Sequence, residues 1–273
     1  MENSHKALAF YTLFTSRIAM FEKTEQGFFR RILGAHSKTA IEALYLELGI
    51  IPFRFQLMMR RIKYFHDIMN RNDEELTKQV VLVQMDKKTK GDFYNQVEGD
   101  LQTLKIDQEA VVFTSKDKLK ELLQKQARTA AFHYLIREIS DLIELAETHS
   151  KVNTTAYTDL NGMAYMNHPQ LTPDLVNLIF KFRTRMYNVK NNFRNNYKQS
   201  NTKCPLCTVH DDSQQHLFEC SEIRKQLPNL KTKHDDIFSS DIDSMIAVGK
   251  ELKEIVDVRE DLVSELLSSQ IQE

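Results

Sequence analysis

Scarcity of the two residues that break regular backbone structure is the feature that most constrains this fold. The chain of 273 residues has 7 glycines (7/273, about 2.6%) and 5 prolines (5/273, about 1.8%), against usual shares of about 7% and 5%. Few such residues means few tight turns and few special backbone angles. The composition therefore favours long helices and argues against sandwiches, barrels and glycine-rich phosphate loops. A hydrophobic share of 41% is enough for a packed core.

Apolar residues recur at helical spacing along most of the chain. The predicted helices run from about 5 to 33, from a cap at Ser37 or Thr39 to Gly49, from Pro52 to about 69, from Thr114 to about 149, from Thr172 to Lys198, and from about 243 to 268. Residues 71–115 are less regular, and Val80–Val83 fits either a short strand or a helix. We therefore predict a mostly α fold, a helical bundle of long helices with a small zinc-knuckle module near the C-terminus.

The same pattern divides the sequence into four predicted segments. They are an N-terminal helical region at 1–91, a connector with a long helix at 92–171, a basic helix plus zinc knuckle at 172–226, and an acidic helical tail at 227–273. Within the connector, residues 150–171 have the polar, turn-rich composition of a linker.

Cysteine usage and hydropathy indicate the compartment. Three cysteines, an odd number, are a poor disulfide framework and favour an intracellular protein. No apolar run approaches the roughly 18 residues of a membrane span. The apolar stretch Ala7–Phe14 follows Glu2 and precedes Arg17, which is not the pattern of a signal peptide.

All three cysteines lie in one short segment, CPLCTVHDDSQQHLFEC, residues 204–220. Cys204 and Cys207 form a Cys-x2-Cys pair, and His216 and Cys220 are spaced to share one side of a short helix. Three thiolates and an imidazole suit one tetrahedral Zn²⁺ with no open position, which is a structural rather than a catalytic site. The alternatives are three free cysteines, or His210 in place of His216 as the fourth ligand.

Charge is distributed unevenly around that segment. From Leu175 to His210 there are seven Lys or Arg and no Asp or Glu, whereas Asp211–Glu273 has 15 acidic and 7 basic residues, a net charge of 7 − 15 = −8. Cations neutralise phosphates, and aromatic rings stack on bases. The predicted nucleic-acid-binding residues are Lys181, Arg183, Arg185, Lys190, Arg194, Tyr197, Lys198 and Lys203. The alternative is an ordinary solvated helical face.

Several stretches together resemble a known family. The segment FFRRILGAHSKTAIEALYLELGIIPFRFQLMMRRIKYFHDIMNRNDEEL (28–76) is similar to the region after the polymerase core of non-LTR retrotransposon reverse transcriptases. Then FRTRMYNVKNNFRNNYK, the CPLC…QQHLFEC segment and the DDIFSS tail with its final helix follow in the order of the C-terminal end of those polyproteins. The resemblance covers the chain from about Thr24 onward.

The resemblance implies a thumb-like N-terminal region followed by a connector and a CCHC zinc knuckle that helps to grip template RNA or target DNA. By the family pattern Cys204, Cys207, His216 and Cys220 are the zinc ligands. The family's polymerase motif places an aromatic residue two positions before an Asp-Asp pair. Neither Asp211-Asp212 nor Asp235-Asp236 has that aromatic residue. We therefore expect the palm and the nuclease to be missing, and the chain not to be an enzyme.

Two functions from different classes remain. The first is a non-catalytic fragment that binds RNA or DNA, nuclear when bound, with the polymerase part of the same element as a further partner and no membrane or small-molecule substrate. The second is a protein–protein interaction module that docks partner helices on the acidic tail or on the methionine-rich helix at 55–69.

Overall fold

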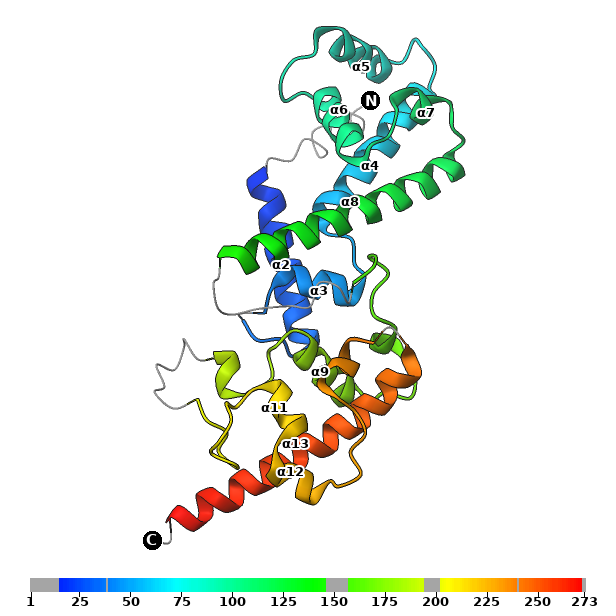
Figure 1. Ribbon diagram of the computed structural model, residues 1–273. Helices are drawn as coiled ribbons and strands as arrows, with labels where there is room; N and C mark the ends of the chain where they lie inside the picture. The colour runs from blue at the N-terminus through cyan, green and yellow to red at the C-terminus, as the bar shows by residue number, and fades with distance from the viewer. Residues whose placement is uncertain (1–14, 38, 146–156, 194–201, 240, 272–273) are drawn as a thin grey trace. The chain divides into compact units, whose positions relative to one another are not determined.

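The structure is a computed structural model that describes residues 15–37, 39–145, 157–193, 202–239 and 241–271. Its α-helices, drawn in Figure 1, are α2 (Thr15–Ile32), α3 (Ile41–Leu48), α4 (Phe53–Met69), α5 (Leu76–Lys87), α6 (Phe93–Leu104), α7 (Gln108–Phe113), α8 (Lys116–Leu145), α9 (Pro173–Arg183), α11 (Gln214–Glu219), α12 (Ser221–Gln226) and α13 (Ile242–Ile271). Short 3₁₀ helices are η2 (Ala164–Asn167), η3 (Lys190–Phe193) and η4 (His234–Phe238).

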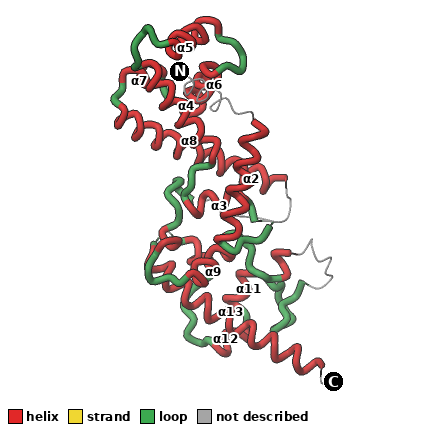
Figure 2. Tube along the Cα trace, turned by 180° about the vertical axis from the view of Figure 1, so that it is seen from behind, coloured by secondary structure: helices red, strands yellow, loops and turns green. Residues whose placement is uncertain are grey.

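The predicted mostly α-helical character is confirmed for the described residues, in which Figure 2 shows helices joined by loops and no strand. One isolated antiparallel bridge joins Lys203 to Asp211. Val80–Val83, open between strand and helix in the sequence, lies within α5. None of the helices described combines the length and apolarity that a membrane crossing requires. The bundle of long helices stays a prediction.

Contacts divide the chain into two compact units. The first comprises the described residues of Met1–Phe28 and Ile50–Leu135, and the second those of Phe29–Gly49 and Ile136–Glu273. The division into four segments made from the sequence stays a prediction.

The first unit is built around α4, which packs against α5, α6 and α7. Phe55, Ile62 and Phe65 from the predicted apolar stripe of α4 are buried, so that face forms core. Arg61, on the same helix, donates two hydrogen bonds of 2.6 and 2.7 Å to the Asp100 carboxylate of α6. Burial raises the pKa of Asp100, and the Arg61 guanidinium opposes this shift. The methionine-rich helix is therefore committed largely to packing within its own unit.

The second unit is built around α13, the long C-terminal helix. It packs against α9, α12, η2 and η4 through buried positions that include Met245, Val248, Leu252 and Ile255. Helix α9 begins as predicted, because Thr172 Oγ1 accepts a hydrogen bond from the Leu175 N–H and Pro173 occupies the first turn.

A buried ion pair joins segments of the second unit that are far apart in sequence. Glu47 of α3 and Arg183 of α9 are 0% and 1% exposed, and Arg183 Nε donates to Glu47 Oε1 at 2.8 Å. The hydroxyls of Tyr157 and Tyr165 donate to the same carboxylate at 2.6 and 2.7 Å. Arg183 Nη1 also donates to the carbonyl oxygen of Ile237 at 2.8 Å. One carboxylate and one guanidinium thus connect α3, the 157–167 segment, α9 and η4.

The protonation states in this network favour its hydrogen bonds. Burial, followed by the charge of Glu47, raises the pKa of Tyr157 and of Tyr165 well above the usual tyrosine value, so both stay protonated donors. Burial alone would lower the pKa of Arg183, but the Glu47 carboxylate together with Tyr165 and Tyr157 more than offsets this, and the net shift is upward. The guanidinium therefore stays charged.

Two facing glycines permit this network. Gly49 has φ +66°, and a β-carbon there would lie 2.3 Å from the backbone nitrogen of Gly162, which itself has φ +81°. Glu47 also accepts, through its carbonyl oxygen, a 2.9 Å hydrogen bond from the Met163 N–H. The described part of the predicted linker, 157–171, is therefore packed against α3 and contributes buried side chains, which corrects the linker interpretation for these residues.

We predict that Glu47→Gln lowers the free energy of unfolding by about 3–5 kcal/mol, because it leaves the Arg183 cation buried without its counter-ion. Urea unfolding followed by far-UV circular dichroism measures the change. Lys225→Ala, which breaks the exposed Lys225–Glu222 pair, is the control and should cost less than about 1 kcal/mol. Equal effects of the two substitutions would contradict the importance assigned to the buried pair.

Candidate metal centre

The four predicted metal ligands converge in the second unit. Cys204 and Cys207 lie on a hairpin-like loop in which the Cys204 N–H donates to the carbonyl oxygen of His210 at 2.8 Å. The loop tightens at Thr208, which has φ +57° and whose N–H donates to the carbonyl oxygen of Cys204. This geometry brings both sulfurs of the Cys-x2-Cys pair to one side.

The other two ligands come from the helical part of the segment. His216 lies in the first turn of α11, where its N–H donates to the Ser213 hydroxyl at 3.1 Å. Cys220 joins α11 to α12, and its N–H donates to the carbonyl oxygen of His216 at 2.7 Å. The short predicted helix therefore exists, and its cap orients the histidine and the cysteine together.

The distances between ligand atoms fit one metal ion. All four lie within 4.8 Å of one another, with Cys204 Sγ 3.9 Å from Cys220 Sγ and Cys207 Sγ 3.2 Å from His216 Nε2. Tetrahedral zinc with bonds of about 2.3 Å to sulfur and about 2.0–2.1 Å to nitrogen places two sulfurs about 3.8 Å apart and a sulfur and a nitrogen about 3.6 Å apart. The four side chains can therefore bind one metal ion with small adjustments. The 3.9 Å separation is too long for a disulfide bond, and all three cysteines are free.

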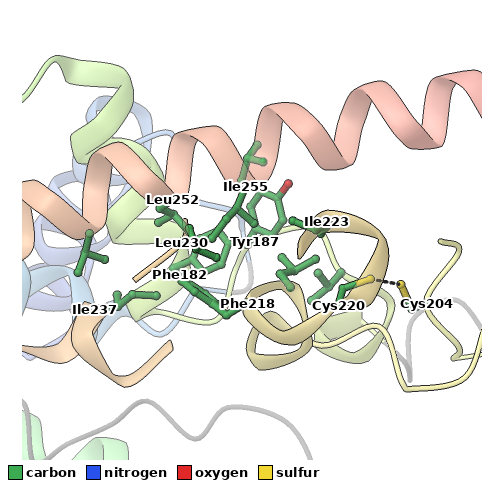
Figure 3. Close-up of a cluster of buried hydrophobic side chains, with 14 residues drawn as sticks. Phe182, Tyr187, Cys204, Phe218, Cys220, Ile223, Leu230, Ile237, Leu252 and Ile255 are labelled. Atoms are coloured by element: carbon green, nitrogen blue, oxygen red, sulfur yellow. Dashed lines mark hydrogen bonds between the residues drawn. The ribbon is translucent and has the colours of Figure 1, made fainter. Parts of the chain in front are cut away.

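The cluster is part of the hydrophobic core of the second unit. Cys204 and Cys220 are 1% and 0% exposed and pack in one cluster with Phe182 of α9, Phe218 of α11 and Ile255 of α13. Figure 3 shows the two sulfurs facing each other at the edge of these apolar side chains. The module therefore shares the core of the second unit and packs on α9 and α13.

The thiol pair is already polarised toward metal binding. A hydrogen bond from the Cys204 thiol lowers the pKa of Cys220 to about 7 against the effect of burial, and N–H groups at the start of α12 act in the same direction. The same thiol bond, together with burial, raises the pKa of Cys204 to about 12. One thiolate is therefore favoured before any cation is present, and metal binding would deprotonate the other thiol.

His210, the alternative ligand, lies beside the cluster rather than in it. Its exposed ring is 5.1 Å from the ring of His216, centroid to centroid. The group of side chains that converges contains His216 and not His210.

The predicted basic helix is two separate pieces. Helix α9 ends at Arg183, Arg185 takes the left-handed conformation with φ +55°, and the chain then folds back to η3. Tyr187 thereby stacks on Phe182, with ring centroids 4.5 Å apart, and becomes buried. The prediction of one helix from Thr172 to Lys198 is wrong for the described residues up to 193, because this tertiary packing outweighs local helix propensity.

The predicted nucleic-acid-binding residues separate accordingly. The prediction is wrong for Arg183: its guanidinium is buried against Glu47, so it is not placed to contact nucleic acid. Lys181, Arg185 and Lys190 are half-buried, and Lys203 is exposed and pairs with Asp211 at 3.2 Å. Burial lowers the pKa of Arg185. The residues that lie outside the described chain are Arg194, Tyr197 and Lys198.

Sequence reasoning missed Asp212, which connects the loop that carries Cys204 and Cys207, called the metal loop below, to its surroundings. This carboxylate is 1% exposed, accepts the Lys190 N–H at 2.9 Å and accepts Arg259 Nη2 of α13 at 3.1 Å. We had considered Asp212 only as half of a possible catalytic pair. No local pattern marks it, because both of its partners are distant in sequence.

Comparison with known proteins adds no relative. No protein-family model matches the chain, and no match is found among curated proteins or solved structures.

We predict that His216→Ala abolishes metal binding, because His216 faces the cysteine sulfurs. His210→Ala should retain one metal ion per chain, because His210 lies outside the cluster. Metal content by mass spectrometry, together with the visible spectrum of the Co²⁺-substituted protein, measures both the number and the geometry of the ligands. Loss of metal in His210→Ala, or its retention in Cys207→Ser, would contradict the ligand set.

Proposed function

We propose that the chain is a non-catalytic, nucleic-acid-binding region of a non-LTR retrotransposon reverse transcriptase, in which one structural zinc ion holds a basic segment in place. Cys204, Cys207, His216 and Cys220 bind the ion, whose role is to fix the loop that carries them. The basic segment is the stretch that follows α9 and includes Lys190. The observation that carries the proposal is that Asp212 bonds the loop to this segment.

Three hydrogen bonds join the metal loop to the basic segment. The Asp212 carboxylate accepts the Lys190 backbone N–H. The backbone carbonyl oxygen of Asp212 accepts the Asn191 N–H at 3.0 Å. Lys190 Nζ donates to the carbonyl oxygen of Lys203, beside the first ligand, at 2.9 Å. Ordering the loop with a metal ion therefore orders the backbone from which several of the cations extend.

The cations that we propose for phosphate contact come from separate elements. Lys181 lies on α9, Arg185 in the turn after it, Lys190 in η3 and Lys203 on the metal loop. Lys181 also lines a hollow of about 530 Å³ together with Asn188, Glu260 and Arg259, of which Arg259 is paired with Asp212. Lysine, arginine and asparagine side chains are the usual partners of phosphate and sugar oxygens. From the sequence alone, the proposal includes Arg194, Tyr197 and Lys198.

The two Asp-Asp pairs support a role without catalysis. Asp212 is used internally, as described above, and Asp236 accepts the Lys233 N–H at 2.8 Å as part of the cap of η4. Polymerase chemistry needs carboxylates that are free to hold two metal ions beside the reacting oxygens. Carboxylates bonded in this way are poorly suited to that task.

The assignment to the reverse transcriptase family depends on the order of the motifs in the sequence. It implies RNA or DNA as the ligand, the polymerase part of the same element as a further partner, and a nuclear location when bound. These remain parts of the proposal.

We predict that a fluorescein-labelled single-stranded oligonucleotide binds the full chain with an affinity that falls steeply with salt. Lys190→Gln should reduce the magnitude of the slope of log K against log salt by about 0.7, because one phosphate contact is lost. Lys118→Gln, which removes the same charge from the exposed surface of α8, is the control and should leave the slope unchanged. Fluorescence anisotropy over a salt series measures both, and no binding at low salt would remove the proposal.

We also predict that removal of the metal by a chelator weakens oligonucleotide binding by about tenfold, which corresponds to about 1.4 kcal/mol. The reason is that the Asp212 loop loses its anchor and releases the basic segment. Returning Zn²⁺ should restore the affinity, and circular dichroism shows whether the remaining helices persist. Unchanged affinity in metal-free protein would separate the metal centre from nucleic-acid binding.

A further inference from the structure

The apolar stripe of α13 continues beyond the core that it covers. Positions 245, 248, 252, 255, 259, 262, 266 and 269 follow alternating steps of three and four, which place them on one helical face. All are apolar except Arg259 and Ser269, so Leu262 and Leu266 are the apolar residues that continue the stripe. Met245, Val248, Leu252 and Ile255 are buried in the second unit. The later positions on the same face lie past this core, where α13 runs on toward the C-terminus (Figure 1).

At Arg259 the stripe leaves the buried core of the second unit. Its guanidinium bonds to the buried Asp212 and so closes the core beside the metal loop. One turn further on, Leu262 is half-buried and Leu266 is 41% exposed. An apolar face that continues past its own core is a recurrent feature of helices that bind a partner.

A groove follows this part of the stripe. It has a volume of about 290 Å³ and is lined by Leu206, Glu222, Leu262, Glu265, Leu266 and Ser269. Small-molecule pockets usually exceed about 300 Å³, so this space suits one or two apolar side chains better than a whole ligand. Leu206 lies between the ligands Cys204 and Cys207, so one wall of the groove belongs to the metal centre.

Charge around the groove identifies the chemistry of its occupant. Of the acidic residues between 257 and 269, Glu265 lines the groove, and Asp257, Glu260 and Asp261 are not among its lining residues. Asp257 is paired with Lys253, and Arg259, the one basic residue in this range, is paired with Asp212. Glu222 adds a carboxylate on the opposite wall, where it pairs with Lys225 at 2.8 Å. An exposed pair of this kind is weak, so a cation of the partner can replace Lys225. Acidic walls repel both nucleic acid and a second copy of the same acidic helix, and they attract a basic segment.

We infer that the groove between Leu206 and the last turns of α13 binds a basic amphipathic helix of a partner protein. Leucine-sized side chains of the partner enter between Leu206, Leu262 and Leu266, and its Lys or Arg side chains face Glu222 and Glu265. This is helix-in-groove recognition, in which residues one turn apart supply the anchors. The inference does not depend on nucleic-acid binding, because the groove and the basic segment use different residues.

A synthetic helical peptide tests the inference on the full, metal-loaded chain. The probe has about 18 residues, with leucine at steps of three and four on one face and lysine elsewhere. A second peptide of the same composition, scrambled so that it is not amphipathic, controls for charge. We expect saturable one-to-one binding of the first peptide in fluorescence anisotropy, and at least about tenfold weaker binding of the second.

Two substitutions that add the same charge distinguish the groove from general attraction. Leu266→Asp places a carboxylate in the groove and should weaken binding by about tenfold, although it adds a charge that attracts the peptide. Leu267→Asp adds that charge at a neighbouring position, 57% exposed and not among the residues that line the groove, and should leave binding within about twofold. Metal content and circular dichroism of both variants confirm that the fold is kept.

Several results would overturn the inference. Binding that is equal in the two variants, or equal for the two peptides, would show charge attraction without a docking site. Displacement of the peptide by an oligonucleotide would identify nucleic acid as the occupant. Self-association of the wild-type chain that Leu266→Asp abolishes would identify a second copy. In each case oligonucleotide binding measured with Lys190→Gln tests the proposed function separately.

Discussion

The buried Glu47–Arg183 pair is the interaction on which the second unit depends. Two tyrosine hydroxyls and a backbone carbonyl complete its hydrogen bonds, so neither charge of the pair is left uncompensated. A pair of this kind often adds little net stability over an apolar contact, but breaking it is costly, and this asymmetry favours a single arrangement of the segments that it joins. The Gly49–Gly162 approach is part of the same constraint, since any side chain there would separate α3 from the segment that carries both tyrosines.

The Cys and His cluster and Asp212 connect this part of the second unit to the C-terminal helix α13. Arg183 ends α9, Phe182 beside it packs in the cluster that contains Cys204 and Cys220, and Asp212 reaches Arg259 on α13. The ligand loop is therefore connected both to α9 and to α13. A metal ion bound there would lock a loop that already has one side in the core, which is a different role from folding an isolated finger.

The metal loop borders two different surfaces. On one side, Asp212 holds the basic segment, and on the other, Leu206 forms a wall of the groove on α13. The charges on the two surfaces are opposite in sign. In the two proposals made above, one metal centre organises a surface for polyanions and a separate surface for a basic helix, because each is reached from a different part of the same loop.

Much of this molecule could be predicted from its sequence alone. The Thr172-Pro173 start of α9, the Gly49 stop of α3 and the convergence of four Cys and His side chains depend on spacing within a few residues, and the structure bears each of them out. Helix periodicity was right for most helices but not for the stretch after Arg183, where α9 ends. The burial of Arg183 and the roles of Glu47 and Asp212 could not be read in this way. A charged side chain carries the same local signal whether it faces water or a counter-ion more than a hundred positions away, as Arg183 faces Glu47. Local spacing therefore determined most of the helices and the convergence of the four candidate ligands, whereas tertiary packing decided where α9 ends and which cations are buried, because only packing brings distant partners together and removes water from between them.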